Sequence, residues 1–266
     1  MAYPTVQAPN GLLPINLIGG QVFAGATRQI PIASGYATSI FYGDPVKLVA
    51  AGTLERDTPD TAMTPVGVFL GCSYTDPTFG KVFRQYYPAS TTASDIMAFV
   101  QDDPDALFQA VAVSGTTVVA AFGRSIVGNN VAMVDNTGST ITGNSAAGVS
   151  DPATTATLPL RVIDVVTDTV LVTTQTGTTT SGSDAVTLSA ANAEILKFMG
   201  VSGTGIAAGT TVNAISGTSL TLSANATASG TVTLTFVGYP QVICKWNVPS
   251  VASLVGGHQY LNPTGV

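Results

Sequence analysis

The densest group of titratable side chains in the chain is Asp102, Asp103 and Asp105, which surround Pro104. Carboxylates this close together are able to bind Ca²⁺, but the alternating spacing of a calcium loop and its later bidentate glutamate are absent. Aspartates on either side of a proline are also common in turns, because their side chains accept hydrogen bonds from nearby backbone amides. The turn is the interpretation that we favour for this run.

Imidazole and thiol chemistry has few candidates, because the chain has one histidine, His258, and two cysteines, Cys72 and Cys244. No nucleophile stands at a spacing from His258 that would support a role as a general base, so we expect a histidine on the surface or in an interface. The two cysteines lie far apart and outside any Cys-x-x-Cys spacing, and with one histidine they predict no metal site. We expect free buried thiols rather than a disulfide, because the N-terminus lacks the basic and apolar segments of a secretory signal.

Two glycine-containing segments, residues 202–205 (Ser-Gly-Thr-Gly) and 25–27 (Gly-Ala-Thr), resemble phosphate-binding loops only faintly. Neither contains the lysine of a P-loop, and neither has the three-glycine spacing that follows a strand in dinucleotide-binding proteins. Turns that need glycine explain both segments better. The sequence thus indicates no catalytic, cofactor-binding or metal-binding residues, and we expect a protein that is not an enzyme and binds no cofactor.

The composition restricts the partners of the chain. Only 9% of its 266 residues are charged, against roughly 25% in an ordinary soluble domain, while 45% are hydrophobic. Nine basic and fifteen acidic side chains give a net charge of −6, and the basic ones are scattered singly. Binding to DNA or RNA depends on clustered Lys and Arg, so no nucleic-acid partner is expected. No apolar run approaches the roughly 18 residues that a membrane-spanning helix needs, so no membrane partner is expected either.

The elements that would position any site begin with residues 1–33, which we interpret as an extended N-terminal arm. Four prolines and four glycines interrupt this segment, which makes a regular helix or a central strand improbable. It nevertheless carries more apolar side chains than a disordered tail retains. Those side chains are Leu12, Leu13, Ile15, Leu17, Ile18, Val22 and Phe23. Two placements remain open: the arm lies on another molecule, or it packs on the body of its own chain.

Residues 34–172 and 237–266 are predicted to form an all-β body, a compact β-barrel or sandwich. Apolar runs of 5 to 7 residues alternate with turn signals, and Val66 to Leu70 reads as a strand covered on both faces. Little helix is expected, with 105–109 and 190–199 as the plausible short helical turns. The return of the richer composition at 242–248 suggests that this last segment completes the sheet begun before residue 173.

Residues 173–236 differ in composition and are interpreted as an inserted small β-module. Asp184, Glu194 and Lys197 are its only charged residues, and Thr, Ser, Gly and Ala dominate. Thr231 to Phe236 alternates small polar with apolar side chains, which is the signature of a half-buried strand. Intrinsic disorder is the alternative that the composition permits, and the clean alternation argues against it.

The order of several short blocks resembles a known family. Residues 43–48 (Gly-Asp-Pro-Val-Lys-Leu) and 64–71 (Thr-Pro-Val-Gly-Val-Phe-Leu-Gly) are similar to segments of head-decoration, or cement, proteins of tailed bacteriophages. Residues 100–108, 140–145 and 158–162 look like blocks in structural proteins of phages that infect aquatic bacteria, including cyanobacteria. The resemblance covers about 36–172 and 237–250. The inserted segment is similar to short β-modules of tail fibres and other virion proteins, although Ala207 stands where a proline is usual.

The resemblance implies a structural protein of the virion, made in the host cytoplasm and bound to the outer surface of the mature capsid. Its partners would be the major capsid protein and further copies of itself, commonly in a homotrimer, and it would stabilise the shell without catalysing a reaction. The side chains that we expect at the capsid or subunit interfaces are Leu12, Leu13, Ile15, Leu17, Ile18, Phe23, Tyr260 and Leu261.

The strongest alternative is a tail-fibre or receptor-binding component of the virion, which would share the β-content and the Thr and Gly bias. Fibres usually contain long repeats or coiled-coil stems, and the chain shows neither. A bacterial surface adhesin is disfavoured by the missing signal peptide. A major capsid protein would need a long spine helix and a basic inner face, which the sequence does not indicate.

Overall fold

The computed structural model describes residues 9–114, 118–119, 124–150, 152–169, 172–195, 199–238, 240–248 and 256–262. Antiparallel strands dominate this part of the chain, so the predicted all-β fold class is confirmed. Its helical elements are three single 3₁₀ turns, Arg124–Ile126, Thr167–Thr169 and Gln259–Leu261. Within the described ranges no helix has the length and apolar character needed to cross a membrane.

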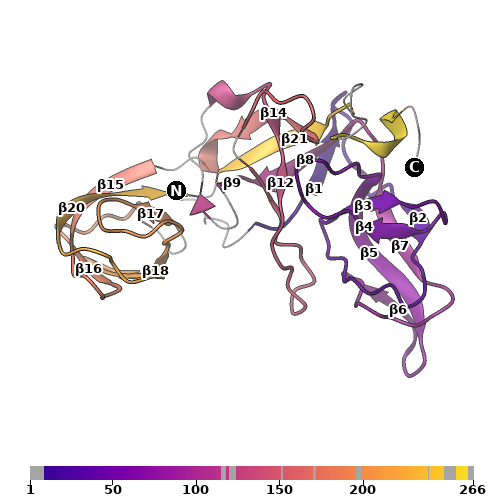
Figure 1. Ribbon diagram of the computed structural model, residues 1–266, viewed down its shortest axis with the longest axis horizontal. Coiled ribbons are helices and arrows are strands. Elements are labelled where there is room, and N and C mark those ends of the chain that lie inside the picture. Colours follow the sequence, from indigo (N-terminus) through magenta and orange to yellow (C-terminus); the bar gives the residue numbers. More distant parts are fainter. Residues whose placement is uncertain are drawn as a thin grey trace. The chain divides into compact units, whose positions relative to one another are not determined.

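The chain forms two compact units, and it passes between them more than once. The main unit contains Pro9–Ala110, Ile126–Asp164 and the described residues from Val242 onward. The second unit contains the described residues of Val111–Ser125 and Val165–Gln241. Each unit is described by itself below (Figure 1).

The first sheet of the main unit has the order β2-β7-β5-β3-β4. Its strands are β2 (Arg28–Pro31), β7 (Met97–Gln101), β5 (Gly67–Asp76), β3 (Pro45–Leu48) and β4 (Leu54–Arg56). A sixth strand, β6 (Gly80–Arg84), pairs with the outer half of β5. Side chains that alternate along β5 and β7, among them Phe69, Tyr74 and Ala98, point into one buried core.

The second sheet of the main unit has the order β1-β8-β21-β14-β11. Its strands are β1 (Leu13–Leu17), β8 (Ala106–Val111), β21 (Gln241–Trp246), β14 (Leu160–Val166) and β11 (Asn130–Val131). Phe108 on β8 and Trp246 on β21 are buried and meet edge to face, with ring centroids 5.1 Å apart. Two further short strands, β12 (Met133–Val134) and β13 (Gly148–Val149), pair with each other. In the sequence they fall between β11 and β14.

The second unit is built on a six-stranded sheet with its own core. The order is β17 (Gly200–Ser202), β20 (Gly230–Val237), β15 (Val172–Thr179), β16 (Ala185–Leu188), β19 (Ser219–Leu222) and β18 (Val212–Ser216). Leu234 and Phe236 on β20 are buried while their neighbours are more exposed, so the alternation predicted for 231–236 is confirmed. A two-stranded sheet of β9 (Val113–Ser114) and β10 (Val118–Val119) belongs to the same unit.

Two strands within residues 9–33, β1 and β2, lie along edges of the main unit's own sheets, and the residues between them form a largely exposed loop. β1 pairs with β8 and β2 pairs with β7, each as an edge strand, and Leu12 and Ile30 are buried. Pro14 and Pro31 are tolerated there, because an edge strand does not need every backbone N–H for the ladder. The structure therefore shows, for these residues, the second of the two placements that the sequence left open. Residues 1–8 of the predicted arm lie outside the described residues.

One local expectation is wrong. Residues 105–109 were expected to form a short helical turn, and the structure places a strand from Ala106 onward, with Ala106 and Phe108 facing the core. Pairing with β1 and β21 on both sides decides the conformation. The apolar run at 107–113 is itself typical of a buried strand. The other segment, 190–199, is only partly described, and its described residues are not helical.

Candidate functional site

The predicted interface residues differ widely in exposure. Leu12 is fully buried, so it belongs to the core of the main unit and is not available to a partner. Ile18, Tyr260 and Leu261 are 49%, 43% and 40% exposed. The remaining predicted residues, Leu13, Ile15, Leu17 and Phe23, are partly buried.

Two of these residues line a cavity of about 570 Å³ between the segment after β1 and the acidic turn. Leu17 and Phe23 form its apolar wall with Val22, whose side chain is 76% exposed. Arg28 on β2 and Asp102, directly after β7, form its charged wall. We call this cavity and the exposed side chains around it the Asp102 surface.

Arg28 and Asp102 in the charged wall interact with each other and with Tyr260. The Arg28 guanidinium pairs with the Asp102 carboxylate and also lies over the Tyr260 ring, 5.1 Å from its centroid. The Tyr260 hydroxyl donates to Asp102 Oδ2 at 3.0 Å. Burial raises the pKa of Asp102, and the neighbouring arginine opposes that shift without cancelling it. These contacts hold Tyr260 in place and leave its ring partly open to solvent.

The acidic run is the turn that the sequence favoured. Asp103 Oδ1 accepts from the Asp105 backbone N–H at 2.8 Å, and the Asp103 N–H donates to the Gln101 side chain at 2.9 Å. The Asp105 carboxylate pairs with Lys245 at 3.3 Å. Across the described ranges, no three or more His, Cys, Asp or Glu side chains are grouped so as to hold a metal ion.

The loop after β1 is tied to this turn through its backbone. The Ile18 N–H donates to the Asp105 carbonyl at 3.0 Å, and the Leu17 N–H donates to the Gln21 carbonyl at 2.8 Å. Gly20 has a φ of 82°, a left-handed conformation that glycine adopts without strain. The tight turn therefore presents Ile18 and Val22 to solvent on a fixed backbone.

His258 is buried, so the expected surface or interface position is wrong. Its Nδ1 accepts from the Tyr260 N–H at 3.2 Å and caps the 3₁₀ turn, and its ring lies 6.1 Å from that of Trp246. Burial lowers its pKa from 6.5 to about 4, against smaller opposing effects of the Val66 carbonyl and of Asp103. A histidine that stays neutral and enclosed holds the C-terminal segment in place and has no access to a substrate.

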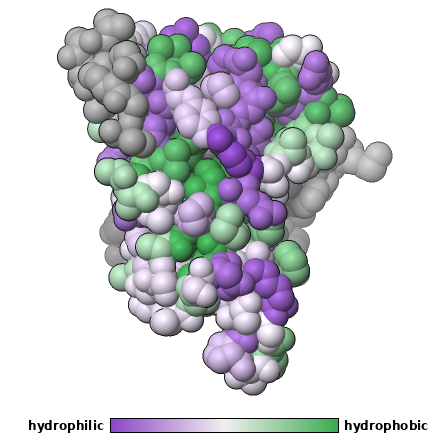
Figure 2. Space-filling view, turned by 90° about the vertical axis from the view of Figure 1, so that its right-hand side faces the viewer, coloured by the Kyte–Doolittle hydropathy of each residue, from purple (hydrophilic) through white to green (hydrophobic). Residues whose placement is uncertain are grey.

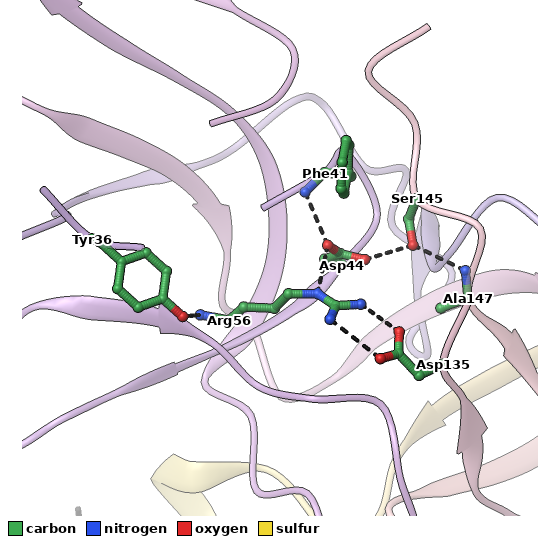
Figure 3. Close-up of polar contacts among 7 residues, drawn as sticks. All are labelled: Tyr36, Phe41, Asp44, Arg56, Asp135, Ser145 and Ala147. Carbon is green, nitrogen blue, oxygen red and sulfur yellow. Dashed lines mark hydrogen bonds and ion pairs between the residues drawn. The ribbon is translucent and has the colours of Figure 1, made fainter. Parts of the chain in front are cut away.

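A second polar centre, which the sequence did not indicate, lies at the buried residue Asp44 (Figure 3). Its carboxylate accepts from the Phe41 N–H at 2.9 Å, from Arg56 Nε at 2.9 Å and from the Ser145 hydroxyl at 2.6 Å. The Arg56 guanidinium also pairs with Asp135 at 2.6 Å. Because the acceptors and donors satisfy one another, the centre joins the loop before β3 to the 135–145 loop and leaves no reactive group free.

The two cysteines are free and buried, as expected. Burial raises the pKa of both Cys72 and Cys244 to about 12. At neutral pH both thiols are therefore protonated, and a protonated thiol is neither a nucleophile nor a metal ligand.

Comparisons with protein-family models, with curated proteins and with solved structures find no match to this chain. The Asp102 surface thus has to be interpreted from its own geometry. It combines exposed apolar side chains, an aromatic ring and a paired arginine on an ordered backbone. This combination is typical of surfaces that contact another protein. It differs from a catalytic pocket, in which the reactive groups are enclosed.

Proposed function

We propose that this chain is a structural virion protein that binds the outer surface of the mature capsid of a tailed phage and stabilises it. The resemblance of the blocks in 36–172 and 237–250 to head-decoration proteins supports the proposal, and the all-β fold is compatible with it. Its partners would be the major capsid protein and, in a homotrimer, two further copies of the chain. No reaction is part of the proposed role.

The observation that carries the proposal is the Asp102 surface, which we assign as the capsid-binding surface. Ile18, Val22 and Tyr260 expose large side chains there. Arg28 and Asp102 beside them are already paired, so docking leaves neither of these two charges without its partner. An apolar centre with few charges and an aromatic anchor is the usual composition of a protein interface core.

Stabilisation would follow from mass action. A protein that binds only the expanded shell lowers its free energy by RT ln(1 + [L]/Kd) at each site, which is about 2.7 kcal/mol when the free concentration is 100 times Kd. Because a capsid repeats the site many times, modest affinity per site is enough to resist internal pressure. A homotrimer would add avidity, since its three Asp102 surfaces bind neighbouring positions together.

The test is co-sedimentation of the purified chain with expanded and unexpanded shells assembled from the major capsid protein of the same genome. We expect saturable binding to the expanded shells alone. Val22→Ser should weaken that binding about tenfold, because it removes an apolar side chain from the centre of the contact. Val248→Ser is the matched control, because Val248 is also exposed and is not part of the Asp102 surface.

Absence of binding to either shell would overturn the proposal. Binding to host cells or to cell-surface glycans in place of the shell would favour the alternative of a tail-fibre or receptor-binding component.

A further inference from the structure

The hairpin of β5 and β6 presents an ordered aromatic side chain at its tip. The two strands pair from Cys72 with Arg84 to Asp76 with Gly80, and the hairpin extends from the rest of the first sheet (Figure 1). Asp76 Oδ1 accepts from the backbone N–H groups of Thr78 and Phe79, at 2.8 and 3.1 Å. These bonds fix the turn, and Phe79 is nevertheless 75% exposed. A ring on a fixed turn is preorganised for contact with another molecule, because its backbone needs no further ordering on binding.

The base of the same hairpin is hollowed into a shallow concavity of about 460 Å³ with aromatic walls. Phe83 on β6 and Phe99 on β7 stack with ring centroids 6.2 Å apart, and Tyr42 and Leu70 complete the apolar lining. Phe83 is 74% exposed, so its ring is covered on one side only. Figure 2, which views the side of the molecule that carries β2, β6 and β7, shows hydrophobic residues gathered in a band between hydrophilic ones.

The tip and the concavity of one chain cannot meet each other. Both belong to the same hairpin, and the four residue steps from Gly80 to Arg84 span about 13 Å in an extended strand. Pairing of β6 with β5 keeps that strand straight, so Phe79 cannot fold back onto Phe83. A Phe79 ring seated in this concavity must therefore belong to another copy of the chain.

Charge complementarity identifies a second copy of this chain as that molecule. The tip carries the Asp76 carboxylate, whose Oδ1 accepts the two turn bonds. The concavity carries Arg84, whose guanidinium lies 5.9 Å from the Tyr74 ring centroid and forms no ion pair within the described part of the chain. A tip that brings an aromatic ring and a carboxylate matches a concavity that offers aromatic walls and a cation.

We propose that two copies of this chain associate by seating Phe79 at the hairpin tip of one copy in the concavity of Tyr42, Leu70, Phe83 and Phe99 of the other, with Asp76 facing Arg84. The contact lies on residues other than those of the Asp102 surface, and it does not depend on the proposed capsid binding. At three-quarters exposure, Phe79 and Phe83 each contribute about 150 Å² of apolar area. A contact of this size is small, so weak self-association in the upper micromolar range is expected.

The first test is sedimentation equilibrium of the full chain across the micromolar range. We expect the wild type to self-associate and Phe79→Ser to weaken the association at least about 30-fold, the loss typical of a central aromatic anchor. Asp76→Asn keeps the oxygen that accepts the turn bonds and removes the charge, and should weaken association by a few-fold at low salt. Val22→Ser, whose side chain is as exposed as that of Phe79, is the matched control and should associate like the wild type.

The second test is disulfide trapping between two single variants. Thr78→Cys places a thiol at the tip, and Gln85→Cys places one at the concavity, without altering Phe79 or the aromatic walls. Mild oxidation of the mixture should give the crossed dimer in preference to either self-pair. The native thiols do not interfere, because Cys72 and Cys244 are buried and burial raises the pKa of each to about 12.

A wild type that stays monomeric throughout the concentration range would overturn the inference. So would an association that Phe79→Ser leaves intact, or trapping that shows no preference for the crossed pair. These results are separate from the capsid assay. Val22→Ser is expected to weaken shell binding about tenfold and to keep self-association. Phe79→Ser is expected to weaken self-association and to leave the affinity of each single chain for the shell unchanged.

Discussion

Acidification is expected to destabilise the C-terminal segment of the main unit through one group, His258. The side chain is fully buried, and its Nδ1 accepts the backbone bond that caps the 3₁₀ turn Gln259–Leu261. Gln259 in turn binds both the N–H and the carbonyl of Leu48, at 2.9 and 3.0 Å. Protonation removes the acceptor and places a charge beside Trp246, so it weakens the cap and the contacts that depend on it.

The magnitude follows from the two protonation equilibria. The pKa of His258 is about 4 in the folded chain, where burial lowers it, and 6.5 in the unfolded chain. Its stabilising contribution is therefore complete above pH 6.5 and is lost as the pH falls from 6.5 to 4, to a total of about 3 kcal/mol. At about pH 4.5 the loss is about 2.5 kcal/mol. Asp57 and Asp102 act in the opposite sense, because burial raises the pKa of each and their protonation favours the folded state.

The assay is urea unfolding at about pH 7.5 and about pH 4.5, followed by fluorescence. Trp246 is the single tryptophan of the chain, is buried in the main unit and lies beside His258, so it reports on this region. His258→Asn is the control, because asparagine retains a capping oxygen and does not titrate. We expect the wild type to lose about 2.5 kcal/mol more than the variant between the two pH values. Equal losses in the two proteins would refute the reasoning.

Three further predictions concern buried groups elsewhere in the main unit and its sheets. Asp44→Asn should lower the free energy of unfolding by about 2 kcal/mol in the same fluorescence assay, because it removes the buried one of the two carboxylates that pair with Arg56 and leaves Asp135 alone to balance the guanidinium. Cys72 and Cys244 should not react with a thiol reagent in the native chain at about pH 8, and both should react after denaturation; reaction of the native chain would contradict their burial. Gly67→Ala should cost at least about 2 kcal/mol, because its Cβ would lie 2.1 Å from a carbonyl oxygen of β7, whereas Gly19→Ala meets no atom within 4 Å and should be tolerated far better.

Local patterns predicted individual strands well. The run from Val66 onward becomes β5, whose first residues are buried on both faces, and 231–236 lies in β20 with the expected alternation. Such strands can be predicted locally, because successive side chains point to opposite faces and the order of apolar and polar residues shows which face is buried. Which strands become neighbours is not local, as the pairing of β5 with β7 shows. Gly71 predicts the end of the run, but β5 continues to Asp76, and Gly71 lies in the bulge between Phe69 and Cys72.

The candidate site was predictable only in part, for the same reason. Ile18 near the N-terminus and Tyr260 near the C-terminus stand out, because the residues around each of them give few indications of regular secondary structure. The ion pair at the centre of the Asp102 surface joins residues that lie 74 positions apart, and Asp44 meets Ser145 across 101 positions. A lone aspartate or histidine in sequence does not reveal its partner, so the buried network and the enclosed state of His258 emerged only from the fold.

The path of the chain between the two units has a mechanical consequence. The chain leaves the main unit at the end of β8, leaves it again at the end of β14, and returns at the start of β21. In the second sheet these three strands are neighbours, in the order β8-β21-β14, and the Ala112 N–H donates to the Pro240 carbonyl where β8 and β21 pass into the second unit. Three of the crossings between the units therefore depend on one hydrogen-bonded group of strands. Loss of pairing at β21, the middle strand, would loosen all three crossings together.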